Sequence, residues 1–393
     1  MTAIVSCYAA FGQELVGVTL RQQTQLLGTR HLAIERAVSR VLGDRPEAVL
    51  LSGLIVKRHR ANVQIIAALL LLAALVPPAR STAAGSLSEI TVNVFPGGFN
   101  WAFFVGQEKG FFSKNGVRIV LQPTQNSVAQ MTGLASDKFD IAMTAIDNIV
   151  AYSEGQGEAP IGPQPEFVAF MGSDSGFLSL VTRPEIKKFS DLRGKTLSVD
   201  ARTTGYAFVL FDILRREGLV EGDYNVVQVG GMTQRWEALR DGKQDGTLLS
   251  TPFDILAKSL GLNQLSWATQ AIGPYQGIVA ATKRSWALAH KNEIAGFIRG
   301  YVTAIDWLYA ESNREEAIQI LMMHLPAISP QLADQTYDEL LDPKAGFYRQ
   351  GKIDLDGMKN VLMLRSRYGQ PKKELTDPLK YYDPSYYEAA MRQ

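Results

Sequence analysis

The chain has 393 residues, of which 46% are hydrophobic and 20% are charged, a composition that is typical of folded proteins and excludes a largely disordered chain. Its formal net charge is +1, and residues 85–393 alone carry a net charge of about −4. Because nucleic-acid binding rests on strong positive charge, we expect no nucleic-acid partner. A chain of this length favours about two domains.

The first informative element in chain order is an export signal. A basic cluster over 57–60 precedes an apolar run over 65–76, and two prolines and several small residues follow. The run is shorter than the roughly 20 residues that span a bilayer, and the small residues suit signal cleavage. We therefore predict a signal peptide over 57–84, cleaved near Ala83 or Ala84, and a periplasmic protein. An uncleaved anchor is the alternative.

Residues 1–56 stand in front of this signal, although export signals belong at the N-terminus. We interpret them as an extension that results from a misassigned start codon. A translated cytosolic segment joined to a sensory ligand-binding domain is the alternative. Cys7, the only cysteine, lies in this stretch. The exported part then has no cysteine for a disulfide, a thiolate-bound metal or a lipid anchor, and we expect a freely diffusing monomer.

From residue 90 onward, short apolar strands alternate with helices, which is the pattern of an α/β sheet. We expect strands over 90–95, 118–122, 141–144 and 166–171, and helices over 101–109, 127–136 and 147–153. These elements form the first part of a predicted lobe 1, over 85–178.

A second run of strands and helices forms a predicted lobe 2, over 179–274. We expect its strands over 179–182, 196–199, 225–229 and 246–249, and its helices over 206–218, 234–240 and 253–260. A strand over 275–281 then returns to lobe 1, and apolar residues from His290 onward recur at helical spacing. The second part of lobe 1, with the C-terminal helices, is therefore predicted over 275–393. Two crossings between lobes predict a hinge.

The loop over 200–206 has the clearest chemistry. It leads into a helix that Gly218 ends, so its hydroxyl groups and backbone amides lie at a helix start, where an anion or a polar ligand edge can bind. Plain helix capping is the alternative for one such loop. Five similar loops occupy strand ends, which line the ligand crevice of α/β sheets. They cover 97–101, 144–148, 173–175, 230–234 and 250–253.

Several short motifs resemble those of the solute-binding proteins of ABC importers for nitrate, sulfonate, taurine and thiamine-pyrimidine precursors. They are Trp101 with 106–112 and 116–117, 140–142 before 147–148, 191–195, and 238–242 with 245–246 and Pro252. The resemblance covers about residues 89–325. It implies an α/β fold of the periplasmic binding protein type II, with two lobes that close on a small molecule and then dock on a membrane permease.

Carried over residue by residue, the resemblance places a ligand pocket on both lobes. The implied ligand-binding residues are Phe99, Asn100, Trp101, Asp147 and Asn148 in lobe 1, Thr203, Thr204 and Tyr206 in lobe 2, and Tyr275 at the return crossing. The threonines suit an anionic group, with Arg202 or Arg235 as its partner. Asp147 and Asp200 instead favour a ring N–H or an amine. We expect an organic ligand, namely a sulfonate, an aromatic acid or a pyrimidine-like compound, rather than a simple oxyanion.

The implied function is solute binding for an ABC importer, without catalysis, cofactor or metal. The expected partners are the small-molecule ligand and the transmembrane subunits of the permease. The alternative is an enzyme on the same fold that forms a pyrimidine precursor. Against this alternative, the exported part has only two histidines, His290 and His324, and both fall in predicted helices away from the strand-end loops.

Overall fold

The computed structural model describes residues 87–392. The predicted extension over 1–56 and the predicted signal peptide over 57–84 lie outside this range. Within residues 87–392, no helix combines the length and the apolar character that a membrane span requires.

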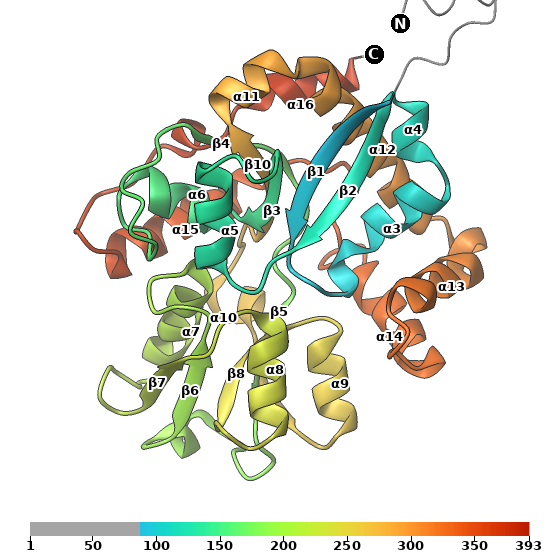
Figure 1. Cartoon of the computed structure of the whole chain (residues 1–393). Helices are drawn as coiled ribbons and strands as arrows, with labels where there is room; N and C mark the ends of the chain where they lie inside the picture. Colours follow the sequence, from blue (N-terminus) through green and yellow to red (C-terminus); the bar gives the residue numbers. More distant parts are fainter. Residues whose placement is uncertain (1–86, 393) are drawn as a thin grey trace, which may run out of the picture. The chain divides into compact units, whose positions relative to one another are not determined.

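The first of two five-stranded sheets is mixed (Figure 1). In spatial order it holds β2 (Val117–Pro123), β1 (Ser88–Val94), β3 (Ile141–Ala145), β10 (Ile278–Lys283) and β4 (Phe167–Gly172). Strand β1 runs parallel to β2 and β3, whereas β10 is antiparallel to β3 and β4. Strand β4 is buried along its whole length, which explains why its sequence is a continuous apolar run rather than an alternating one.

Helices cover both faces of this sheet, and lobe 1 denotes the sheet together with these helices. Helices α5 (Ser127–Ala135) and α6 (Ile146–Ser153) pack on one face. The helices on the other face are α3 (Trp101–Glu108), α4 (Phe111–Lys114), α12 (Lys291–Leu308) and α16 (Pro384–Met391). Beside them lie α11 (Arg284–Ala289), α13 (Arg314–His324) and α14 (Pro330–Leu340). The apolar residues of α12 recur at helical spacing, as predicted, and Phe297 among them packs on Phe103 in the core.

The second sheet is also mixed, and lobe 2 denotes this sheet with its helices. In spatial order it holds β7 (Asn225–Gln228), β6 (Thr196–Val199), β8 (Gly246–Ser250), β5 (Leu178–Thr182) and β9 (Asn263–Trp267). Strand β6 is parallel to β7 and β8, and β5 is antiparallel to β8 and β9. The helices are α7 (Gly205–Arg216), α8 (Met232–Arg240), α9 (Phe253–Ser259) and α10 (Ala268–Ile272). Strand β9 is half-buried throughout and mostly polar, so its sequence does not predict a strand.

Two short segments carry the chain between the lobes. Strand β4 leads through 173–177 into β5, and α10 leads through 273–277 into β10. The two segments lie side by side, because the Ser173 amide donates to the Ile278 carbonyl over 2.9 Å and the Gly277 amide donates to the Asp174 carbonyl over 2.9 Å. The predicted α/β architecture of two lobes and two crossings is confirmed. The exact boundaries after residues 178 and 274 stay predictions.

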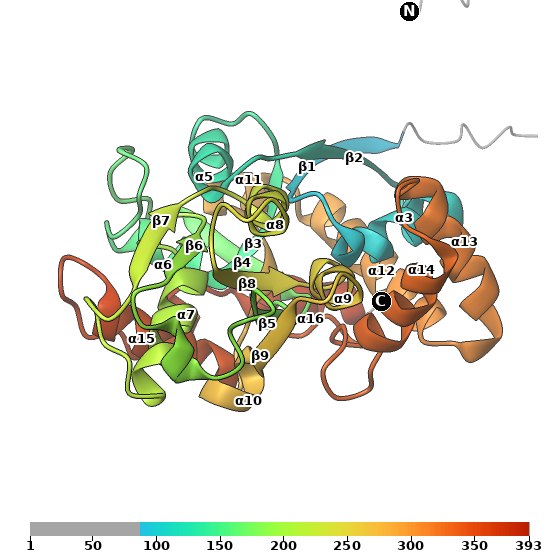
Figure 2. The same ribbon diagram turned by 90° about the horizontal axis from the view of Figure 1, so that it is seen from below.

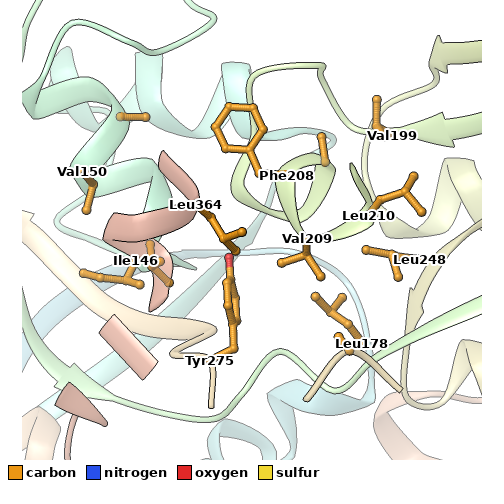
Figure 3. Packing of buried hydrophobic residues seen from close by; sticks show 14 of the residues in the cluster. Ile146, Val150, Leu178, Val199, Phe208, Val209, Leu210, Leu248, Tyr275 and Leu364 are labelled. Carbon is orange, nitrogen blue, oxygen red and sulfur yellow. The ribbon is translucent and has the colours of Figure 1, made fainter. Parts of the chain in front are cut away.

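Helix α15 (Leu355–Tyr368) forms a third connection, which no motif in the sequence indicates. It packs against α6 of lobe 1 and against α7 of lobe 2. Leu364 of α15 belongs to a buried apolar cluster that also holds Ile146 of α6 and Phe208 of α7, as Figure 3 shows. Arg367 adds an ion pair, since its Nη1 lies 2.6 Å from Asp212 Oδ1 on α7. The hydrophobic core therefore continues from one lobe into the other.

Replacing Gly277 with alanine should destabilise the hinge, because a Cβ there would lie 2.2 Å from the Gly176 backbone nitrogen on the other crossing. Backbone atoms cannot yield as a flexible side chain can. We expect the free energy of unfolding, measured by urea denaturation, to fall by about 2–3 kcal/mol. Gly194→Ala is the control, because its site has open space and only a left-handed backbone disfavours a side chain, by about 1–2 kcal/mol. A loss at Gly277 no larger than at Gly194 would contradict the close approach.

Candidate functional site

A cavity lies between the two lobes, at the ends of strands from both sheets. The space open to the centres of water molecules amounts to about 70 Å³. Lobe 1 contributes Phe95, Phe99, Asn100, Phe103, Ser127, Met143, Ala145 and Asn148; the crossings and β10 contribute Ser173, Asp174, Gly176, Phe177 and Ile278; lobe 2 contributes Asp200, Thr204, Gly205, Tyr206, Gly231, Met232, Arg235 and Ser250. Apolar walls with a few polar groups are typical of small-molecule sites.

Strand ends and helix starts place these residues. In lobe 2, β6 ends at Val199, Asp200 follows, and α7 begins at Gly205. Carboxyl ends of parallel strands meet at one edge of a sheet, where the following helices begin. Ser127, Gly205 and Met232 each open a helix. Three helix starts, with their positive dipole ends, therefore lie at the cavity.

Direct contacts join the lobes beside this cavity. Asp200 Oδ2 in lobe 2 accepts a hydrogen bond from the backbone amide of Ser127 in lobe 1, over 3.0 Å. The amide of Gly231 in lobe 2 donates to the carbonyl of Gln125 in lobe 1, over 3.1 Å. The two lobes are therefore closed on the cavity in this structure.

Asp174, on the first crossing, is an acid group in the wall of the cavity, with 1% of its surface exposed. Its Oδ1 accepts a hydrogen bond from the Gly176 amide over 2.7 Å, and its Oδ2 accepts one from the Ser173 hydroxyl over 2.6 Å. Loss of solvation outweighs these bonds and raises the pKa of Asp174 to about 6. The charge of the cavity therefore changes in the mildly acidic range.

Arg235 on α8 brings a buried positive charge to the same cavity. Its Nη1 donates to the Leu248 carbonyl over 2.8 Å, and its Nε donates to the Gly230 carbonyl over 3.2 Å. Burial lowers the pKa of Arg235, and the nearby Asp200 carboxylate opposes this shift. Because backbone carbonyls take up these donors, the guanidinium supplies the cavity with charge more than with free hydrogen bonds.

Two buried polar atoms of the lining have no hydrogen-bond partner among residues 87–392, namely Asp200 Oδ1 and the Tyr206 hydroxyl. An unpaired buried polar atom costs roughly 1–3 kcal/mol, so both atoms favour a ligand that supplies the missing bonds. The carboxylate can only accept, whereas the hydroxyl can donate or accept. The two atoms suit a ligand that offers an N–H or O–H donor to Asp200 and a further polar atom to Tyr206.

Five of the nine predicted ligand-binding residues line the cavity: Phe99, Asn100, Asn148, Thr204 and Tyr206. Four others lie outside the lining. Trp101 is fully buried in lobe 1, where its Nε1 donates to the Ala317 carbonyl over 3.0 Å. The Thr203 hydroxyl donates to Glu158 Oε2 over 2.6 Å at the surface. Tyr275 lies behind Tyr206, with 6.2 Å between the ring centroids.

Asp147 is the fourth, and an ion pair explains its position. Its carboxylate is buried against Arg365 of α15, whose Nε donates to Oδ1 over 2.9 Å and whose Nη2 donates to Oδ2. The same Nη2 donates to the Thr203 carbonyl of lobe 2 over 2.8 Å. The charge of Asp147 is thus compensated within the protein. No sequence signal reveals this pair, because the two residues are 218 positions apart.

Asp174, Asp200 and Arg235 are the charged residues of the lining, and the pocket implied by the resemblance omits all three. The loops that hold the two aspartates are nevertheless predicted at strand ends, Asp200 is predicted as an acceptor for a ring N–H or an amine, and Arg235 is predicted as a partner for an anion. Position in the chain thus identifies the segments, whereas the side chains that face the cavity depend on tertiary packing. Within the described residues, no group of three or more His, Cys, Asp or Glu side chains could hold a metal ion.

Asp174→Asn should change how stability depends on pH. The folded protein raises the pKa of Asp174, so its ionisation is disfavoured on folding and stability is lost as the pH rises from about 4 to about 6. The amide keeps an acceptor for Gly176 but cannot ionise. We expect the variant to lose this part of the pH dependence and to gain about 1–3 kcal/mol at pH 7 in chemical unfolding. Parallel pH profiles for the variant and the wild type would contradict this expectation.

Comparison with known proteins identifies the family and the fold. The family model described as "NMT1/THI5 like" matches residues 100–315. No curated protein sequence matches significantly. Among solved structures, the periplasmic nitrate-binding protein NrtA from Synechocystis PCC 6803 is similar, with a TM-score of 0.64, 12% identity, and coverage of 78% of this chain and 89% of that chain.

Two further solved structures are similar to this chain to about the same degree. The ligand-binding component of an ABC-type import system from Staphylococcus aureus has a TM-score of 0.62 and 15% identity, over 78% of this chain and 100% of that chain. The alkanesulfonate-binding protein SsuA from Xanthomonas axonopodis pv. citri, bound to MOPS, has a TM-score of 0.61 and 12% identity, over 75% of this chain and 99% of that chain. Both the resemblance and the fold predicted from the sequence are thus confirmed: the chain belongs to the NMT1/THI5-like family and has the periplasmic binding protein fold.

Proposed function

We propose that this protein is the periplasmic solute-binding component of an ABC importer, which captures a small organic molecule between its lobes and delivers it to a membrane permease. The observation that carries this proposal is the cavity between the closed lobes, whose lining holds buried polar atoms without partners. Similar structures support it, because they include a ligand-binding component of an ABC-type import system and proteins that bind nitrate and alkanesulfonate.

The charges of the lining favour a ligand with an N–H donor over an anion. Asp174 and Asp200 bring two acid groups, and the one guanidinium, that of Arg235, already binds two backbone carbonyls. An anionic ligand would meet an unpaired carboxylate oxygen in a poorly solvated site, which is costly. Of the three ligand classes expected from the sequence, we therefore propose the pyrimidine-like one for this cavity.

The shape of the lining supports a flat and compact ligand. Phe99 and Phe103 from lobe 1 and Tyr206 from lobe 2 bring aromatic rings to the cavity from both sides. Aromatic side chains in such positions stack on flat rings and add about 0.5–1.5 kcal/mol per pair beyond the burial of area. Because both lobes contribute, a bound ring would stabilise the closed arrangement, and closure would report occupancy to the permease.

Native mass spectrometry of the purified protein tests the proposal directly. We expect a small organic molecule to dissociate from it intact. A thermal-shift screen of pyrimidines, sulfonates and aromatic acids should then raise the melting temperature, with pyrimidine-like compounds giving the largest shift. Turnover of the bound compound would overturn the binding function and favour the enzyme alternative.

Tyr206→Phe separates ligand binding from folding. It deletes a hydroxyl that has no partner in the part of the chain that the structure describes, so the free energy of unfolding without ligand should not fall. Affinity for the best compound of the screen, measured by calorimetry, should fall by about 5-fold to 10-fold.

Tyr275→Phe is the matched control. Its hydroxyl is also buried and has no partner within the described residues, but Tyr275 lies outside the lining of the cavity. We expect its affinity to equal that of the wild type. If Tyr275→Phe weakens binding and Tyr206→Phe does not, the ligand lies on the Tyr275 side, and the position of the site proposed from the cavity is wrong.

A further inference from the structure

A second contact between the lobes lies next to the ligand cavity and involves two carboxyl groups. Ser250, the last residue of β8, lines the cavity, and its hydroxyl donates to the Gly176 carbonyl over 2.6 Å. The next residue, Thr251, is fully buried, and its hydroxyl donates to Glu339 Oε1 on α14 over 2.5 Å. Helix α9 of lobe 2 packs against α14 of lobe 1 at this place, as Figure 2 shows.

Asp254 is the second carboxyl group. It lies on α9, is fully buried, and its Oδ2 accepts a hydrogen bond from the Ser179 hydroxyl over 3.1 Å. The side chains of Asp254 and Glu339 also lie close enough for a hydrogen bond with each other. Neither carboxylate can donate when ionised, so this bond requires a proton on one of the two groups. Asp254 comes from lobe 2 and Glu339 from lobe 1, and opening of the lobes would separate them.

We propose that Asp254 and Glu339 form an acid latch, in which the two carboxyl groups share one proton and hold the lobes closed more firmly in acidic than in alkaline solution. The proton comes from solvent when the lobes close. This inference deepens the proposed function, because the motion concerned is the one that would enclose the solute. The latch itself rests only on the two-lobed fold and on the contact between α9 and α14.

The surrounding positive charge does not outweigh the effect of burial on the two carboxyl groups. Lys258, one helical turn beyond Asp254, is the positive group that acts on both carboxyls. On α14, Asp338 is engaged elsewhere, because its Oδ1 lies 2.7 Å from Arg314 Nη1 on α13. Strands β5, β8 and β9, which also pack on α9, bring no charged side chain.

Burial in the closed form therefore determines how the latch titrates. Burial raises the pKa of Asp254, and burial together with the Asp254 charge raises the pKa of Glu339 to about 7. When the lobes open, solvent reaches both groups and their pKa values return toward about 4. Closure is then fully favoured below about pH 4 and loses this contribution as the pH rises to about 7.

A distance measurement tests the latch without any ligand. Fluorophores on Lys114→Cys in α4 and Glu237→Cys in α8, both exposed positions, place one label on each lobe of the full chain once Cys7 is replaced by serine. Single-molecule energy transfer between them gives the ratio of closed to open molecules. We expect this ratio to fall by about tenfold or more between about pH 5 and about pH 8.

Two variants give the latch a signature that a purely structural contact would not have. In Glu339→Gln, the amide oxygen can accept from Thr251 and the amide nitrogen can donate to Asp254, so the bond no longer needs a proton. Its ratio of closed to open molecules should be nearly the same at both pH values, and Asp254→Asn should behave alike. Asp338→Asn, one position from Glu339 but outside the latch, should keep the pH dependence of the wild type.

The outcomes are distinct from those of the ligand tests. Equal pH dependence in the wild type and in Glu339→Gln would overturn the latch, as would a wild-type ratio that does not change with pH. Neither result touches the proposed function, because native mass spectrometry and the thermal-shift screen do not depend on Glu339. Conversely, a protein that binds no solute but shows the predicted pH dependence would keep the latch and lose the proposed function.

Discussion

The buried ion pair between Asp147 and Arg365 is the contact on which the arrangement of the lobes depends. Both side chains are almost wholly removed from solvent, and the Arg365 guanidinium also stacks on the Phe208 ring of lobe 2 at 4.4 Å. Removing two charges from water is expensive, and only close pairing with further hydrogen bonds compensates for the cost. Because α15 supplies the arginine, a helix near the end of the chain completes the interface between the lobes.

Three acidic residues at the boundary between the lobes differ in how completely a partner compensates their charge. Asp147 has a full partner in Arg365. Asp200 is bound on one oxygen only, since its Oδ2 accepts from Ser127 while its Oδ1 has no partner. Asp254 has another acid as its neighbour. A compensated charge holds the structure together, an incompletely bound one can recognise a ligand, and a pair of acids can respond to protons.

Local patterns in the sequence predict much of the fold. Strands such as β3 and β4 are apolar runs, α12 has strong helical periodicity, and the strand-end loops are marked by glycine and hydroxyl residues. Local patterns do not predict strand β9 or the packing of helix α15 between the lobes, because both depend on partners that are distant in the sequence. The candidate site is predictable to the level of its loops. Packing between the lobes decides that the Asp200 side chain faces the cavity, whereas the Thr203 side chain, three residues later, faces the surface.

The adjacency of the two crossings determines how the lobes can move. Residues 173–177 and 273–277 are hydrogen-bonded to each other, so they approximate a single axis about which one lobe can rotate relative to the other. Displacement in a rotation grows with distance from the axis. Asp174, on the axis, would keep its hydrogen bonds to Ser173 and Gly176 during opening, whereas α9 and α14, joined only by side chains, would separate. A small rotation about this axis therefore moves the residues near the ligand only slightly but displaces the outer edges of the lobes by a large distance.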